Sequence, residues 1–424
     1  MIHYTSTHGI GNAWIAAELE IMERKGIPFE LHSLHRNHQD FFGNSWATRL
    51  AQDTNVIYPV RPGAFLKSVV LAPFLFRERF LKVCRNAFFG KRENLRVRLV
   101  GILHIFVASH WARQLRDKEV SHIHAQWCQA SGTLAMYGSW LLGIPFSFTG
   151  HAADLFRERF AFEDKIRNAE FIVCISSFHR ELYKQHGARD EQLVDVFCGI
   201  DTDQFPYAFH PIEGGRPRIL SVGRLVEKKG FDVLIDACGI LRDRGVDFEC
   251  VIAGDGPLES SLRDQVIAAD LVDRVQLTGR PILQGDLPRF LSTGHLFAQP
   301  CVWARDQDVD GTPRTLMEAM ACGIPSISTR LVGIPDIIED GIAGLLVEPR
   351  DAVGLADAME RIISDPALAE RLSKGGRERM ERLFQIDVCL ETLAQLYRER
   401  LGRIPKAIPP PKSLSIRTRE ESVA

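Results

Sequence analysis

Short apolar runs alternate with amphipathic stretches along most of the 424-residue chain. Nearly continuous apolar runs are typical of strands that helices cover on both faces, as in parallel sheets. Helical patterns lie between the runs, for example at residues 231–244 and 258–269. The alternation therefore predicts an α/β fold with two doubly wound parallel sheets. The predicted strands are PFELHSL, NVIYPV, HIHAQW, PFSFTGH and FIVCIS in the first half, and RILSVGR, FECVIAG, VQLTG, HLFAQP and PSIST in the second.

A segment rich in glycine and proline separates the two series. In YAFHPIEGGRPR, residues 207–218, neither a strand nor a helix pattern survives. We therefore predict a first Rossmann-like domain over residues 1–208 and a second over 209–384. Residues 403–424 are rich in proline and lack apolar periodicity, which predicts a disordered tail.

Composition excludes several classes of protein. The chain is 45% hydrophobic and 25% charged, as in soluble globular proteins, and its net charge of −2 favours no particular partner. Nine cysteines without C-x-x-C spacing indicate reduced thiols, not a disulfide frame or a zinc site. The first residues lack a secretory signal pattern, and the uncharged apolar run at 99–112 is shorter than the roughly 20 residues a membrane span needs. We expect a cytoplasmic protein.

One segment departs from the alternation. Residues 61–118 carry thirteen Lys and Arg against three acids, a net charge of +10. Basic residues beside aromatic ones suit a surface that lies on anionic lipid, which would make the protein peripheral on the inner face of the cytoplasmic membrane. Helices that pack on their own sheet with a solvated basic face fit equally well. Nucleic acid is not expected as a partner, because no known binding motif accompanies the charge. The aromatic residues of the segment include Phe65, Phe74, Phe76, Phe80, Phe88 and Phe89.

The stretch DQDVDGTPRTLMEAMACGIP, residues 306–325, raises the question of a metal loop. Asp306, Asp308 and Asp310 alternate and precede a glycine, as in a calcium loop of the EF-hand type. Position twelve of such a loop must be a glutamate but is Met317 here, with Glu318 one residue late. The pattern thus argues against calcium, whereas a looser D-x-D magnesium site stays open as an alternative.

The start of the chain holds an incomplete dinucleotide motif. In HGIGNAW, Gly9 and Gly11 fit G-x-G-x-x-G, but Trp14 occupies the third position, which must be small. A dinucleotide cofactor is therefore not expected. A glycine turn that opens a helix at Asn12 could still line a cleft.

Residues 312–325 predict a short buried helix. Thr312 is a suitable N-cap, Pro313 suits the first helical position, and Gly323 suits the C-terminal stop. An apolar surround makes Glu318 costly unless something pairs with it, and this surround is formed by Leu316, Met317, Ala319, Met320 and Ala321. A bound hydroxyl group would do so, although a glutamate that reaches solvent needs no partner.

The beginning of this helix is suited to an anionic ligand. Free backbone amides at Gly311, Thr312 and Arg314 would point from the helix start, where partial positive charge accumulates. Asp310 comes just before and can accept hydrogen bonds from hydroxyls. The stretch is therefore suited to a ligand that bears both hydroxyls and phosphate.

Two further stretches place polar residues at the carboxyl ends of predicted strands, where open α/β sheets bind ligands. In SVGRLVEKKGFDVLI, Arg224 follows a strand and Lys229 precedes a helix, so that the two cations could clamp a diphosphate. The alternative is two exposed cations on a loop. In FSFTGHAADLF, His151 follows an apolar strand, where both a functional and a structural role stay open.

Together these stretches resemble the retaining glycosyltransferases of family four, whose GT-B fold has two Rossmann-like domains facing across a cleft. The motifs that carry the likeness are GHAADLF, CGIDTDQF, SVGRLVEKKGFDVLIDA, VIAGDGPL, DGTPRTLMEAMACGIPSIST and GIPDIIEDGIAGLLVEP. These motifs are most similar to those of a bacterial branch of the family that builds exopolysaccharides, including colanic acid, and lipid-linked sugars. The resemblance also implies that residues 385–402 form a helix that crosses back to the first domain.

The resemblance implies roles for individual residues. The family's acid-x₇-Glu motif is Asp310-x₇-Glu318 here, with aspartate where glutamate is commoner, so its reach to the donor sugar is one methylene shorter. Glu318 would hold the ribose, Arg224 and Lys229 the diphosphate, and His151 the donor sugar near the reacting carbon. The catalytic residues would then be His151, Arg224, Lys229 and Asp310, the donor-binding residues Gly223, Gly279, Arg280, Gly311, Thr312, Pro313, Thr315 and Glu318, and the acceptor-side residues Gly11 and Asn12.

The activity that the resemblance implies is transfer of a sugar from a nucleoside diphosphate donor to a glycan or lipid-linked acceptor. Neither a cofactor nor a metal ion would be required, since two cations neutralise the diphosphate. Retention of configuration implies a front-face substitution in which a donor phosphate oxygen takes the acceptor's proton. A non-catalytic sugar-nucleotide-binding protein and a sugar-nucleotide epimerase on the same fold are the alternatives.

Overall fold

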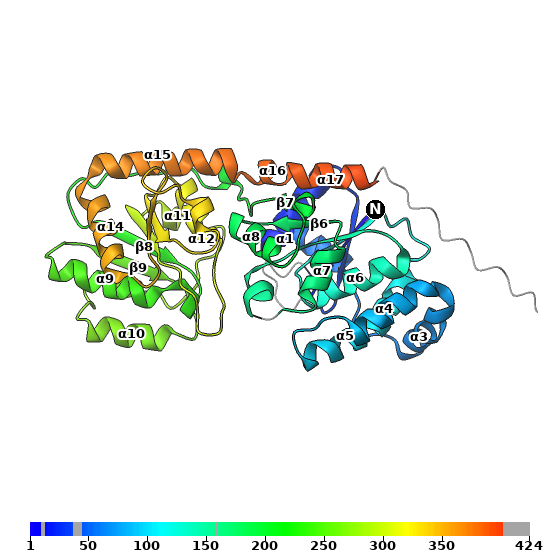
Figure 1. The fold of residues 1–424 in the computed structure, drawn as a ribbon. Helices are drawn as coiled ribbons and strands as arrows, with labels where there is room; N and C mark the ends of the chain where they lie inside the picture. Colours follow the sequence, from blue (N-terminus) through cyan, green and yellow to red (C-terminus); the bar gives the residue numbers. More distant parts are fainter. Residues whose placement is uncertain (10–12, 37–44, 158, 402–424) are drawn as a thin grey trace, which may run out of the picture.

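Two parallel α/β domains lie side by side in the computed structural model, which describes residues 1–9, 13–36, 45–157 and 159–401 (Figure 1). The first sheet has seven strands in the order β3-β2-β1-β4-β5-β6-β7, and the second has six in the order β10-β9-β8-β11-β12-β13. Every strand pair within the two sheets is parallel. This confirms the prediction of two doubly wound sheets.

The first domain alternates strands and helices as far as residue 195. Its strands are β1 (Ile2–Ser6), β2 (Phe29–Ser33), β3 (Asn55–Val56), β4 (His122–Gln126), β5 (Phe146–Thr149), β6 (Phe171–Cys174) and β7 (Leu193–Asp195). Its helices are α1 (Ala13–Arg24), α2 (Ser45–Asp53), α3 (Pro62–Phe76), α4 (Glu78–Phe89), α5 (Leu95–Leu115), α6 (Ala130–Leu142), α7 (Phe162–Asn168) and α8 (Ser177–Gln185), with a π-helical turn at η1 (Ala153–Arg157).

The second domain begins at residue 218, after a segment, 207–217, without helix or strand. Its strands are β8 (Arg218–Val222), β9 (Glu249–Ala253), β10 (Val275–Leu277), β11 (Leu296–Gln299), β12 (Ser326–Thr329) and β13 (Leu345–Val347). Its helices are α9 (Phe231–Asp243), α10 (Glu259–Ala268), α11 (Leu287–Leu291), α12 (Arg314–Ala321), α13 (Ile334–Ile337), α14 (Ala352–Ser364) and α15 (Pro366–Leu383).

The last described helices return to the first domain. Figure 1 shows α15, α16 (Ile386–Cys389) and α17 (Glu391–Leu401) following one another from the second domain to the first. Tyr397 of α17 is fully buried in one apolar cluster with Tyr4 of β1 and Phe171 of β6. The first domain therefore takes part of its core from the end of the described chain.

Three strands escaped the sequence prediction, and each for a local reason. Strand β1 is central and buried at all five positions, yet His3, Thr5 and Ser6 are polar. Strands β7 and β13 have three residues each, too few to form a recognisable apolar run.

Helices α3, α4 and α5 fill the interval between β3 and β4 where the basic segment lies. By length and composition alone, α5 could cross a membrane. Its second half, however, is buried, with Ile105, Ala108 and Trp111 in the core cluster of the first domain. We therefore interpret α5 as a core helix.

Candidate active site between the two domains

The loop after β8 places two cations at the carboxyl edge of the second sheet. Arg224 is exposed, and within the described chain no hydrogen bond or ion pair holds its guanidinium. Lys229 reaches back across Gly223, where a Cβ atom would lie 3.0 Å from the lysine Cε. Glycine at position 223 therefore gives the lysine its path to the edge of the sheet.

Lys229 forms an ion pair with Asp310. Its Nζ lies 2.5 Å from the Oδ2 atom of Asp310, and 12% of the lysine side chain is exposed. Burial alone would lower the pKa of Lys229, but Asp310 outweighs this and raises it. Burial likewise would raise the pKa of Asp310, and Lys229 lowers it instead. Both groups are therefore charged at neutral pH.

The other two aspartates of the D-x-D-x-D run also have cationic partners. Asp308 Oδ2 lies 3.0 Å from Lys228 Nζ, and Asp306 Oδ2 lies 3.1 Å from Arg157 Nη2. The carboxylates of a metal loop converge on one ion. Here each points to a different cation, one of which belongs to the first domain.

Helix α12 begins one residue later than its sequence predicts. Its first residue is Arg314, and Pro313 is the N-cap with φ −69° and ψ 115°. The carbonyl of Pro313 accepts the first helical hydrogen bonds, from Leu316 and Met317, which is what makes it the cap. The prediction of Thr312 as N-cap and Pro313 as first helical residue was therefore wrong.

The end of α12 follows the prediction. Gly323 has φ 76°, and its N–H donates to Met320 while that of Ile324 donates to Ala319. This double hydrogen bond is a Schellman motif. At the other end, among the described residues, the N–H groups of Gly311, Thr312 and Arg314 donate to no protein acceptor.

Glu318 is buried in α12, with 2% of its side chain exposed. Gln284 Nε2 donates to its Oε1 over 3.1 Å, and Arg314 Nε lies 3.7 Å from the same oxygen. The interpretation of Glu318 as a solvent-facing glutamate is therefore wrong. The Nη1 atom of Arg314 is buried and has no partner among the described residues. The sequence analysis missed Gln284 and the Arg314 side chain, because neither belongs to a repeating pattern.

The remaining residues predicted to bind a donor divide into two groups. Gly279 and Arg280 follow β10, so they lie at the same carboxyl edge as Gly223, and Arg280 is exposed. Thr315 instead donates its hydroxyl to Gln299 Oε1 over 3.0 Å, which ties α12 to the end of β11. Its hydroxyl therefore has a protein partner.

His151 lies two residues after β5, at the carboxyl edge of the first sheet. It is 8% exposed, and its ring centroid lies 4.8 Å from that of Trp127. Burial, with a smaller effect of His179, lowers the pKa of His151 to about 3. The imidazole is therefore neutral at physiological pH and acts as a hydrogen-bonding group.

Asp154 fixes the loop that carries His151, and the sequence analysis missed it. Its Oδ1 accepts from the His151 N–H over 2.6 Å, and its Oδ2 accepts from the Cys128 N–H. Burial raises the pKa of Asp154 to about 7, although these two backbone donors oppose the shift. It lies in the π-helical turn η1, a rare element that is frequent at functional sites.

Contacts across the domain boundary bring the two candidate regions together. Phe156, five residues after His151, packs edge-on against Trp303 with ring centroids 5.2 Å apart. The Ser177 N–H donates to Asp336 Oδ2 over 2.7 Å. Together with the pair between Arg157 and Asp306, these contacts hold the His151 loop against the loop that leads to Asp310. Gly11 and Asn12 lie outside the described residues.

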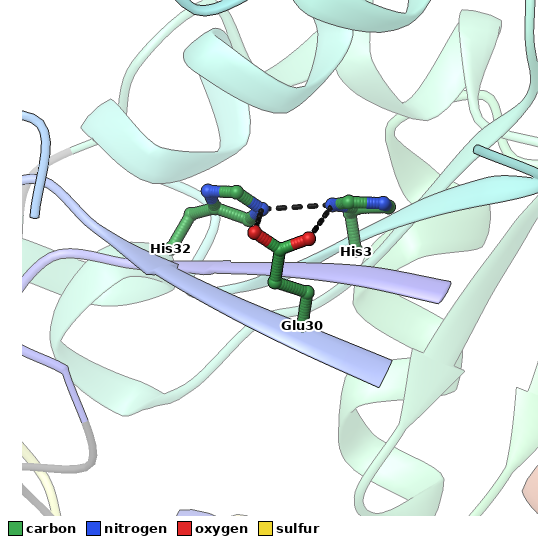
Figure 2. Close-up of side chains that lie close together, drawn as sticks. All are labelled: His3, Glu30 and His32. Atoms are coloured by element: carbon green, nitrogen blue, oxygen red, sulfur yellow. Dashed lines mark hydrogen bonds and ion pairs between the residues drawn. The ribbon is translucent and has the colours of Figure 1, made fainter. Parts of the chain in front are cut away.

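A second cluster of polar groups lies on strands β1 and β2 of the first sheet (Figure 2). His3, Glu30 and His32 offer three ligand atoms within 4.8 Å of one another. Trp111 Nε1, which can only donate, lies 3.1 Å from His32 Nδ1, so the proton of neutral His32 resides on Nε2. That N–H donates to His3 Nδ1 over 2.8 Å and leaves no lone pair on Nε2 for a cation.

The Glu30 carboxylate of this cluster also has partners of its own. Lys118 Nζ lies 2.6 Å from its Oε1, and Asn55 donates to the same oxygen over 2.6 Å. Burial lowers the pKa of His3 to about 4, so that the histidine is neutral. We interpret the cluster as a hydrogen-bonded part of the core.

The sequence is similar to a known protein family and to individual curated proteins. Residues 207–379 match the family described as glycosyl transferases group 1. The amylovoran biosynthesis glycosyltransferase AmsK of Erwinia amylovora is 36% identical over 209 residues, which cover 48% of this chain and 51% of that protein. The putative colanic acid biosynthesis glycosyltransferase WcaL of Escherichia coli (strain K12) is 34% identical over 194 residues, which cover 45% of this chain and 47% of that protein. The chain thus spans about half the length of these curated relatives.

Solved structures extend the likeness to both domains. Anabaena Alr3699/HepE in complex with UDP has a TM-score of 0.70 at 16% identity, covering 94% of this chain and 99% of that one. The apo form of the lipopolysaccharide outer core galactosyltransferase WaaB has a TM-score of 0.66 at 16% identity, with the same coverage. At these identities the likeness shows the fold, which is GT-B. The matched family and the relatives support a glycosyltransferase on that fold.

Proposed function

We propose that the chain is a retaining glycosyltransferase of family four that transfers a sugar from a nucleoside diphosphate donor to a glycan or lipid-linked acceptor. The acceptor belongs to polysaccharide or glycolipid synthesis at the cytoplasmic face of the membrane. The observation that carries the proposal is the pair of cations, Arg224 and Lys229, at the sheet edge that faces the start of α12. The names of AmsK and WcaL, and the UDP bound to HepE, support the donor and the pathway class.

The ion pair between Lys229 and Asp310 suggests how the donor enters. In the unliganded protein Asp310 neutralises the buried ammonium. The donor diphosphate replaces Asp310 as the ion-pair partner of Lys229. The Asp310 carboxylate is then free to accept hydrogen bonds from the sugar hydroxyls. Arg224 has no competing partner among the described residues and binds the diphosphate directly.

The rest of the donor site follows from α12. The N–H groups of Gly311, Thr312 and Arg314 bind phosphate and sugar oxygens at the positive end of the helix. Glu318 accepts from the ribose hydroxyls, and the buried Nη1 of Arg314 supplies a further donor to the phosphates.

Transfer then breaks the bond between the anomeric carbon and the diphosphate oxygen and forms a bond from that carbon to the acceptor oxygen. The acceptor oxygen attacks the face from which the diphosphate leaves, which retains the anomeric configuration, and its proton passes to an oxygen of the departing phosphate. Arg224 and Lys229 stabilise the negative charge that develops on the leaving diphosphate. Neutral His151 donates or accepts a hydrogen bond near the reacting carbon. No metal ion is needed in this scheme, because cations already surround the diphosphate.

A thermal-shift screen of UDP, GDP, ADP and dTDP and their sugars tests donor binding, since a ligand of the folded state raises its melting temperature. We expect one nucleotide to raise it and its diphosphate to be released only when an acceptor extract is added, with or without chelator. Release that stops in chelator would contradict metal independence. Conversion of the donor without acceptor would identify an epimerase, and binding without turnover a non-catalytic protein.

A further inference from the structure

Exposed apolar side chains gather on α3, α4 and α5. Nineteen large hydrophobic residues are exposed in the described chain, and nine of them lie on these three helices. Single exposed apolar residues are ordinary, whereas a gathering of them marks an interaction site. We name these nine the α3–α5 patch: Leu66, Val70, Phe74, Leu81, Phe88, Phe89, Leu95, Leu99 and Leu103.

The patch follows helical spacing. In α3 the exposed residues Leu66, Val70 and Phe74 recur every fourth position and so share one face. Leu95, Leu99 and Leu103 do the same in α5. Each helix buries other residues against the domain, such as Ser68, Ala72 and Phe76 in α3. The exposed stripes are therefore additional to the packing faces and contribute nothing to the core.

The turn between α4 and α5 brings the most exposed aromatic ring beside these stripes. Phe89 ends α4 and is 83% exposed. Arg98 of α5 donates to the carbonyls of Phe88 and Gly90, and it thereby holds the end of α4 against the first turns of α5. Phe88 and Phe89 are therefore both exposed at the junction of α4 and α5.

Basic side chains border the apolar ones. Arg61, Lys67, Arg77 and Arg85 are exposed, and none forms an ion pair within the described residues. Residues 61–118 carry +10 in a chain of net charge −2, so the remainder carries −12. The positive charge of the protein is therefore concentrated around the patch.

The combination of exposed apolar side chains and unpaired cations favours one kind of partner. A second copy of the chain would bring two surfaces that carry unpaired cations against each other, which is unfavourable. A nucleic acid would use the charge but not nine exposed aliphatic and aromatic side chains. An anionic bilayer uses both, because the apolar groups enter the acyl boundary while lysine and arginine bind lipid phosphates.

We propose that the α3–α5 patch binds the protein to anionic membrane. Phe74, Phe89 and Leu99 enter the interface, and the four unpaired cations contact the headgroups. The inference goes beyond the proposed function, because it rests on the surface of three helices remote in sequence from the donor-binding residues.

Co-sedimentation of the full chain with vesicles tests the proposal. We expect binding to vesicles that are one-third phosphatidylglycerol in phosphatidylcholine, and little binding to phosphatidylcholine alone. Added salt should weaken the binding, because exposed charges are largely screened beyond the Debye length, which is about 8 Å at 0.15 M ionic strength. Equal binding to both vesicle types would contradict the proposal.

Two variants separate the apolar contribution from the charge. We expect the triple variant F74S/F89S/L99S to weaken binding at least about tenfold. The quadruple variant R61Q/K67Q/R77Q/R85Q should weaken it by roughly 100- to 1000-fold at low salt, taking about 1 kcal/mol for each charge. All seven sites are exposed, so both variants should keep the melting temperature and the nucleotide response of the wild type.

The control is I267S/V272S/V353S, which removes three apolar residues of the second domain that are also more than half exposed. It should bind vesicles like the wild type. Equal vesicle binding by the triple variant and this control would overturn the proposal. Sedimentation equilibrium without lipid adds a second criterion: a dimer that the triple variant dissociates would assign the patch to a second copy instead.

Discussion

The two domains have the same strand topology but distribute their polar residues differently. In the second domain the charged groups of the candidate site gather where strands end and helices begin, and the described strands beneath contain buried serine, threonine and glutamine but no histidine. In the first domain polar side chains occupy the sheet itself. His122 Nε2 and His124 Nδ1 each lie 2.7 Å from the Ser147 hydroxyl, and His124 Nε2 lies 3.1 Å from Thr149 Oγ1.

This difference separates a binding edge from a hydrogen-bonded core. Burial lowers the pKa of both His122 and His124, so that the chain of hydrogen bonds is neutral and stabilises one arrangement of the strands. The family match covers the second domain, residues 207–379. Changes at the edge of the second domain should therefore affect donor chemistry, whereas changes in the first should affect positioning and stability.

Arg224→Ala should give the largest loss. We expect kcat/KM to fall by about 10²–10³ or more, since the guanidinium stabilises charge on the leaving group. The melting temperature should not change, because the side chain is exposed and no ion pair holds it in the described chain. Arg289→Ala, at an exposed position on α11, is the matched control for steady-state kinetics. Near wild-type transfer by Arg224→Ala would contradict the proposal that Arg224 and Lys229 bind the donor diphosphate.

Glu318→Gln comes next, with donor affinity as its readout. We expect the nucleotide Kd to rise about 10- to 100-fold, because a hydrogen bond to a charged group contributes about 1.5–3 kcal/mol. Isothermal titration measures this effect, with exposed Glu370→Gln on α15 as control. An unchanged Kd would mean that Glu318 only supports Gln284 and Arg314.

Asp154→Asn tests positioning in the first domain. The amide can accept from one of the two backbone N–H groups, but its own N–H₂ must face the other. We expect kcat to fall about tenfold through the loss of one charged hydrogen bond, with nucleotide Kd unchanged. A loss of donor affinity together with the loss of kcat would contradict the assignment of donor binding to the second domain and of positioning to the first.

The pH profile of the same variant sharpens this test. The pKa of Asp154 is raised to about 7, so acidification protonates it and removes one acceptor. Wild-type activity should therefore decline below pH 7, and Asp154→Asn should lack that limb. Exposed Asp190→Asn should keep the wild-type profile.

Glu18→Gln should have the smallest effect, on stability alone. Burial raises the pKa of Glu18 to about 7, although the Gln126 amide donates to its carboxylate over 2.8 Å. Between the ordinary value near 4.3 and about 7, the folded state binds more protons, so wild-type stability falls as pH rises. The variant lacks this slope. Its melting temperature should exceed that of wild type by a few degrees at pH 8 and by little at pH 5.

Much of the fold could be predicted because its strands are apolar on both faces. The strands that escaped prediction were too polar, like β1, or too short, like β7 and β13. The apolar periodicity of a sequence indicates which residues are buried. A strand whose polar side chains hydrogen-bond to one another is buried without being apolar, so periodicity does not detect it. His3 and His32 illustrate this, because they hydrogen-bond to each other inside the sheet.

The candidate site was predictable where several functional residues follow one another in the chain. The stretch from Asp310 to Glu318 and the loop from Arg224 to Lys229 carry such patterns. Gln284 and Asp154 act singly, and only folding brings each to its partner. The cap of α12 was misassigned by one residue, because Thr312 and Pro313 both suit a helix start and only the backbone angles distinguish them.

The crossing of α17 back to the first domain has a consequence for biogenesis. The ribosome makes residues 391–401 after the entire second domain, yet these residues cover Tyr4 and Phe171 in the first. The second domain is contiguous and can fold as it emerges. The domain that is synthesised first must wait with an uncovered face until α17 leaves the exit tunnel.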